Sequence, residues 1–174
     1  MTKLSIVLAL VLVPAVAAAD DDVVPGGVRL GVTPSVMFQS SNGQSSTGYG
    51  GNLSIGYELE HGTLGITPLL DLGYASFSST PSTNLAFAIP TLQLAFHEGR
   101  FVPAVEVGVG YGYAWASVNG TTISDNYLAL SVGAQLDYRV SPGFLLGIAA
   151  HYKPFLEPAL TSFIDVGVNA TFAL

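Results

Sequence analysis

The sequence predicts an all-β fold, specifically an eight-stranded antiparallel up-and-down transmembrane β-barrel. Residues 101–116, FVPAVEVGVGYGYAWA, alternate large apolar side chains with small ones, and a period of two is that of a β-strand. Mean hydropathy is +0.51, yet no segment after residue 19 has the run of about 18 apolar residues that a spanning helix needs. Because lipid offers no partners to the backbone, a spanning protein without helices must be a closed barrel.

Residues 1–19 have the pattern of a cleaved signal peptide. Lys3 provides the positive charge, residues 4–13 form a short apolar run, and residues 17–19 form an A-x-A cleavage site. The apolar run is too short to span a bilayer as a helix. We therefore expect residues 20–27 to be a short N-terminal lead-in and residues 28–174 to form the barrel.

Eight alternating segments follow one another in the barrel region, each with one bulky apolar face and one small or polar face. In the fourth segment, the apolar residues of 85–89 share a face with those of 92–96 only if a bulge near Pro90 shifts the alternation. The expected strands are 28–38, 49–59, 64–75, 84–96, 101–116, 128–139, 144–153 and 164–174.

Prolines lie inside several of these segments, where a closed barrel has no free edge to tolerate a missing N–H group. We expect each of them to mark a bulge or the entry of a strand. These prolines are Pro34, Pro68, Pro90 and Pro103.

The connections between the segments alternate in length, which sets the two ends of the barrel. Long polar connections are expected at 40–47, 78–83, 117–126 and 154–162, and short turns at 61–62, 98–100 and 141–143. Long and short connections must then lie at opposite ends. Both termini fall at the short-turn end, which in an outer membrane is the periplasmic one.

The aromatic residues of the bulky faces fall into two groups by height, as the two girdles of a transmembrane barrel do. The short-turn end collects Tyr57, Phe96, Phe101, Tyr138, Phe144 and Phe172. The long-connection end collects Phe38, Tyr49, Tyr74, Tyr113, Trp115 and Tyr152.

In this pattern, residues 28–174 resemble the small eight-stranded outer-membrane barrels of the OmpA/OmpX type. Residues 164–174 resemble the C-terminal assembly signal of that family, except that Phe172 lies two positions before a terminal Leu174. The resemblance implies a monomer in the lipids of the bacterial outer membrane, with both termini periplasmic. It also implies insertion by the barrel assembly machinery through the last strand.

The inward faces carry most of the charged residues of the barrel region 28–174, and these residues form a candidate polar network in the lumen. If the first hairpin is symmetric about Gly43 and Gln44, Arg29 lies directly across from Glu58. The network could serve as a gate or an ion path, but eight strands leave an interior just wide enough for side chains, which favours a static network. Its candidate members are Arg29, Glu58, Asp71, Glu106, Asp137, Arg139, His151, Lys153 and Asp165.

Several kinds of chemistry are disfavoured by composition. The chain has no Cys and no cluster of His, so neither a metal nor a cofactor is expected. Of five Lys and Arg residues four remain without Lys3, too few for a nucleic-acid partner. His151 points inward, beside Asp165, and no Ser converges with it as a nucleophile, so no catalytic residues are expected.

The sequence thus favours a non-enzymatic outer-membrane barrel with a filled polar lumen. Such a protein would contribute to envelope integrity or to surface interaction through its extracellular loops. Three alternatives stay open at this point. They are a lipid-modifying barrel enzyme, a narrow gated pore, and a soluble secreted barrel whose faces are inverted to bind an apolar ligand.

Overall fold

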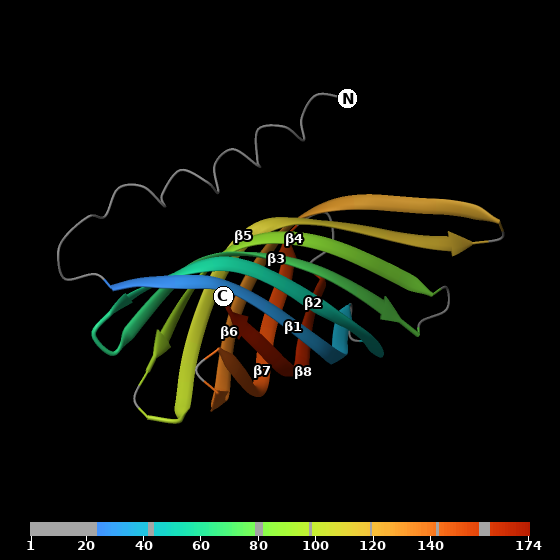
Figure 1. The fold of residues 1–174 in the computed structure, drawn as a ribbon. Helices are drawn as coiled ribbons and strands as arrows, with labels where there is room; N and C mark the ends of the chain where they lie inside the picture. Colours follow the sequence, from blue (N-terminus) through green and yellow to red (C-terminus); the bar gives the residue numbers. More distant parts are fainter. Residues whose placement is uncertain are drawn as a thin grey trace.

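The computed structural model describes residues 24–41, 44–78, 82–97, 99–118, 120–141, 143–156 and 161–174; the expected signal peptide lies outside them. Eight antiparallel strands each pair with the next, and β8 pairs with β1 to close the barrel (Figure 1). This confirms the predicted fold class. The strands are β1 (Val24–Ser41), β2 (Gln44–His61), β3 (Leu64–Phe77), β4 (Thr83–Phe96), β5 (Phe101–Val118), β6 (Thr121–Ser141), β7 (Phe144–Leu156) and β8 (Thr161–Ala173).

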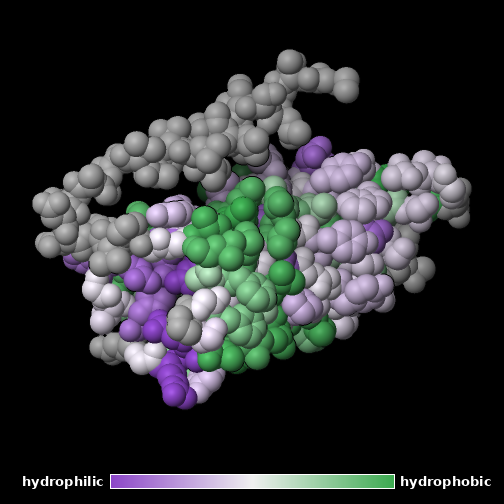
Figure 2. Space-filling model, viewed as in Figure 1, coloured by the Kyte–Doolittle hydropathy of each residue, from purple (hydrophilic) through white to green (hydrophobic). Residues whose placement is uncertain are grey.

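The bulky faces look outward, as the sequence predicts. Val107 and Ile148 are 58% and 61% exposed, whereas Glu106 is 7% exposed. Figure 2 shows an apolar band across the middle of the visible face, with more hydrophilic surface at both ends. The alternative with inverted faces, a soluble barrel with an apolar interior pocket, is therefore wrong. Among the described residues, no helix is long and apolar enough to cross a membrane.

Two of the expected long loops are instead continuations of paired strands. β1 runs to Ser41 and β2 starts at Gln44, and β5 and β6 stay paired out to Val118 and Thr121. Gly120, at the tip of the β5–β6 hairpin, has a φ of 80°, a backbone conformation that favours glycine. The prediction failed here because polar side chains do not prevent backbone pairing above the membrane. In Figure 1 the β5–β6 hairpin extends beyond the other strands.

β4 keeps one uninterrupted alternation, so the bulge expected near Pro90 is absent. Its register with β3 runs without a shift from Leu64 opposite Phe96 to Phe77 opposite Thr83. Phe87 and Ile89 are buried inside the barrel, whereas Leu92 is 44% exposed on the outside. The two apolar runs of this strand therefore lie on opposite faces.

Three of the expected in-strand prolines, Pro34, Pro68 and Pro90, leave gaps in the strand ladders without changing the register. The β1–β8 ladder pairs Val32 with Ala170 and Ser35 with Gly167, and skips Thr33 and Pro34. The same two-residue gaps occur at Pro68 between β2 and β3 and at Pro90 between β4 and β5. A missing N–H thus costs pairing locally, and the expectation of bulges was wrong for these three. Pro103 lies near the entry of β5, just beyond the last pair of the β4–β5 ladder.

Candidate functional site

The barrel interior contains all nine residues of the candidate polar network, in two groups. Arg29, Glu58, Asp137 and Arg139 lie near the short turns, and the remaining five lie closer to the middle. We call these the short-turn group and the central group. The central group consists of Asp71, Glu106, His151, Lys153 and Asp165.

In the short-turn group, Glu58 is the shared acceptor. Arg29 Nη2 forms an ion pair with Glu58 Oε1 and lies 3.8 Å from Glu60 Oε1. His97 Nε2 lies 3.2 Å from Glu58 Oε1, and Arg139 Nη2 donates to His97 Nδ1 at 3.0 Å. His97, which the candidate set omitted because it stands beside a turn, therefore links the two arginines through Glu58.

The pairing of Arg29 with Glu58 does not arise from the register that the sequence suggested. Ser41 is paired with Gln44, so the first hairpin is centred on residues 42–43 and Arg29 faces Gly56. The Arg29 side chain reaches Glu58 diagonally. A long guanidinium tolerates this two-residue offset, and the ion pair forms although the predicted register was wrong.

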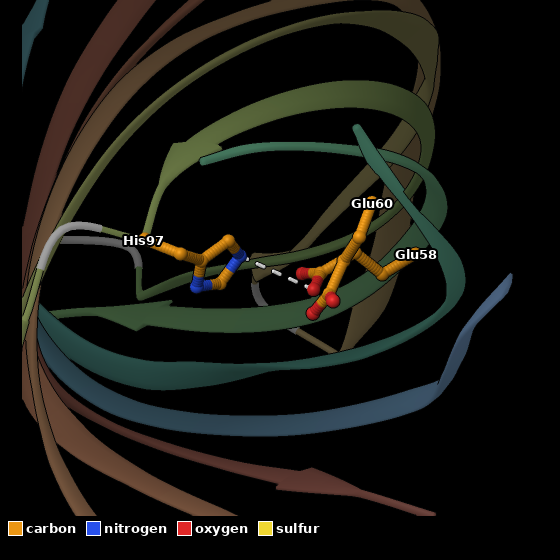
Figure 3. Close-up of side chains that lie close together, drawn as sticks. All are labelled: Glu58, Glu60 and His97. Carbon is orange, nitrogen blue, oxygen red and sulfur yellow. Dashed lines mark ion pairs between the residues drawn. The ribbon is translucent and has the colours of Figure 1, made fainter. Parts of the chain in front are cut away.

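Glu58, Glu60 and His97 also satisfy the geometry of a metal-binding group, with ligand atoms within 4.8 Å of one another (Figure 3). The surrounding charges argue against a metal ion. Because Arg139 can only donate, His97 Nδ1 must accept, and the proton of the neutral ring then lies on Nε2. Nε2 therefore has no lone pair for a metal and lies 3.2 Å from Glu58 Oε1. This group fits an ion-pair network.

In the central group, His151 is held between two carboxylates. Its Nδ1 lies 2.6 Å from Asp165 Oδ1 and its Nε2 lies 2.9 Å from Glu106 Oε1. Lys153 pairs with the second oxygen of Asp165. A Cβ on Gly133, across the ladder, would come within 2.3 Å of His151 Cδ2, so the glycine makes room for the imidazole ring.

Amide and hydroxyl side chains connect the two groups. Gln93 Nε2 lies 3.5 Å from both Glu106 Oε2 and Gln135 Oε1, and Gln135 donates in turn to Asp137. Asp71 accepts from Thr91 Oγ1 at 3.4 Å. The cavity left among these side chains is about 30 Å³, which is room for about two water molecules. The polar part of the interior is therefore filled.

The end of the interior opposite the short turns is apolar, which sequence reasoning did not anticipate. Phe155 and Phe163 stack with ring centroids 5.5 Å apart, and Phe77 meets Phe163 edge-on at 5.9 Å. Lys153 Nζ lies 5.2 Å from the ring centre of Phe87, which joins this cluster to the charged residues below. We call this set the aromatic plug. It comprises Met37, Ala75, Phe77, Leu85, Phe87, Ile89, Ala129, Phe155 and Phe163.

A signal for the plug was present in the sequence. Phe77 lies two residues after Ala75, Phe155 two after Lys153, and Phe163 two before Asp165, so each continues an inward alternation. These phenylalanines were missed because they stood at or beyond the expected strand ends. The expectation of a polar lumen therefore holds only below the plug.

Solved structures of outer-membrane barrels are similar to this chain. Neisserial surface protein A (NspA) has a TM-score of 0.69 at 14% identity, over 87% of this chain and 99% of that one. Ail, the attachment invasion locus protein of Yersinia pestis, in complex with the heparin analogue sucrose octasulfate, has a TM-score of 0.59 at 19% identity, over 86% of this chain and 100% of that one. The outer membrane enzyme PagL has a TM-score of 0.52 at 17% identity, over 84% of this chain and 99% of that one. At these identities the likeness shows the fold alone.

Sequence comparison gives the family. No curated protein sequence matches the chain. The family model of the outer membrane protein beta-barrel domain matches residues 5–172, nearly the whole chain. This match, the closed ring of eight strands and the outward apolar band agree with one another, and they confirm the resemblance to small eight-stranded outer-membrane barrels. The chain belongs to the outer membrane protein β-barrel family and lies in the bacterial outer membrane.

Proposed function

We propose that this protein is a non-enzymatic, monomeric barrel that contributes to envelope integrity or to surface interaction. The observation that supports this most is the filled interior. Two linked charged groups leave a cavity of about 30 Å³ between them, and the aromatic plug lies above. A lumen packed in this way disfavours the narrow gated pore.

The surface role rests on the hairpins at the end opposite the short turns. Residues 121–126 at the tip of the β5–β6 hairpin are all exposed, and they carry hydroxyl, amide and carboxylate groups. In the proposed orientation, both termini are periplasmic and this hairpin faces the outside of the cell. β8, with Phe172 stacked on Phe144 at 4.9 Å, would be the strand that the assembly machinery recognises.

Conductance measurements test the proposal. Because the cavity among the polar side chains has room for only about two water molecules, the purified protein reconstituted in a planar lipid bilayer should show no steady unit conductance. A large porin in the same bilayer serves as the positive control. Reproducible channels of one size from this protein, at concentrations at which denatured protein gives none, would contradict the proposal.

The enzyme alternative is kept open by PagL, an outer membrane enzyme with the same fold. In this chain, both ring nitrogens of His151 already contact carboxylates, so neither is free to activate a nucleophile. Ser131 is buried on β6, the strand that pairs with the strand of His151. Its Oγ has no hydrogen-bond partner among the described residues, so it makes no nucleophile–base pair with His151. The geometry therefore favours a structural role for His151.

Lipid analysis separates the two functions. In cells that produce the wild-type protein, the His151→Gln variant or no barrel, the lipid A species seen by mass spectrometry should be the same. Heat-modifiable mobility on gels verifies that the variant is folded. A lipid A species that appears with the wild type and disappears with folded His151→Gln would favour the enzyme.

A further inference from the structure

A cavity of about 190 Å³ lies in the outer mouth of the barrel, against the aromatic plug. Its apolar lining consists of Phe77, Leu85, Ala114, Tyr127, Phe155 and Phe163. Gln39 and Thr83 also line it, and no charged side chain of the described residues does. A space with this lining favours an uncharged, apolar occupant.

The walls of this cavity are held in place by ring contacts. Tyr127 meets Phe155 edge-on at 5.9 Å, and Phe155 is stacked on Phe163. A Cβ on Gly112 would come within 2.5 Å of Phe155 Cε1, so the glycine at this position leaves the space that the Phe155 ring occupies. Phe163 in turn lies over Lys153 Nζ at 5.7 Å, at the boundary with the charged central group. The cavity is therefore pre-formed and closed below.

A second cavity, of about 270 Å³, continues from the first along the β5–β6 hairpin. The two share Thr83, Ala114 and Tyr127, and the second extends to Trp115 and Ile123. An apolar cavity of ~150 Å³ is enough to bind benzene, so the first cavity alone is large enough for an apolar group. Because the two cavities adjoin along shared residues, the joined space suits a chain better than a compact ring.

The far end of the joined space lies near the membrane surface. Trp115 stacks on Tyr113 at 5.6 Å and lies 6.1 Å from Tyr74, and both tyrosines belong to the outer aromatic girdle. Asp125 lines the second cavity, where its negative charge disfavours an anionic head group. It is the only acidic residue among the described lining residues of either cavity.

We propose that the joined cavity binds one hydrocarbon chain of an outer-leaflet lipid. The chain enters beside Trp115, passes Ala114 and Tyr127 and ends against Phe155 and Phe163. The head group stays outside. The choice of the outer leaflet rests on the orientation proposed above, whereas the site itself does not depend on the proposed surface role.

Photo-crosslinking tests the proposal, because the strand alternation separates the two sides of the wall. The protein is reconstituted in phosphatidylcholine vesicles that contain phosphatidylcholine with a diazirine at the end of one acyl chain. After irradiation, adducts are assigned to single residues by fragmentation mass spectrometry. Surrounding lipid should label outward residues such as Leu92 and Val107. A chain in the cavity should also label Phe155 or Phe163, which bilayer lipid cannot reach.

Ala114→Phe fills the first cavity and should lower the inward adducts at least tenfold without changing the outward ones. The matched control Ala134→Phe makes the same substitution on the lipid-facing side and should leave the inward adducts unchanged. Ala114→Leu, a smaller change, serves if the first variant does not fold. The proposal is overturned if inward residues carry no adducts, or if their adducts persist in the folded variants. Labelling by a free diazirine fatty acid but not by the lipid would also overturn it.

Discussion

Val107→Arg should lower the free energy of unfolding of the protein in lipid bilayers by ~2–4 kcal/mol. Val107 lies midway between the aromatic ends of the outward face of β5, and 58% of its surface is exposed. In a membrane this surface contacts hydrocarbon, where a guanidinium loses its hydration. The same substitution on a water-exposed β-sheet face would cost far less, so the size of the loss reports the surrounding medium.

Unfolding by urea in phospholipid vesicles, followed by tryptophan fluorescence, measures this free energy. The matched control is Val140→Arg, because Val140 is 55% exposed but stands at the end of β6, next to the short turn. There the loss should be only ~0–1 kcal/mol, since the side chain reaches the water interface. Equal losses at the two positions would show that depth in a membrane does not set the cost, and would contradict the orientation of the bulky faces.

The orientation of most strands could be predicted because most inward positions are filled by small or polar residues. Residues 101–116 show this most clearly, since Glu106, Gly108 and Gly110 can all be packed inside a narrow barrel. β4 could not be predicted in the same way. Both of its faces are apolar, one toward lipid and one toward the aromatic plug, and alternation alone does not tell two apolar faces apart.

The candidate site was predictable in its members but not in its contacts. Which charged residues point inward follows from a period of two, whereas which of them touch depends on the register, and a register depends on where each turn lies. The polar stretches 40–47 and 117–126 hid those turns. His97 and three phenylalanines of the plug, Phe77, Phe155 and Phe163, stood outside the expected strands, so no alternation was read through them.

Lys153→Met should destabilise the barrel by ~3–5 kcal/mol, the usual cost of removing one partner from a buried ion pair. The side chains of Lys153 and Asp165 are 1% and 0% exposed, and they are paired with each other. Met keeps most of the apolar volume of the lysine stem, so the loss comes from the charge. Asp165 is then left without its strongest counterion, beside Glu106 on the far side of His151.

The double variant Lys153→Met/Asp165→Asn separates the charge from the packing. Asn removes the uncompensated carboxylate and keeps an oxygen for His151 Nδ1, so urea unfolding in vesicles should show that much of the stability returns. Arg100→Met is the control for the loss of a positive charge, because Arg100 is exposed at a short turn, and its stability should match the wild type. A double variant less stable than Lys153→Met would mean that Asp165 stabilises the interior without its cation.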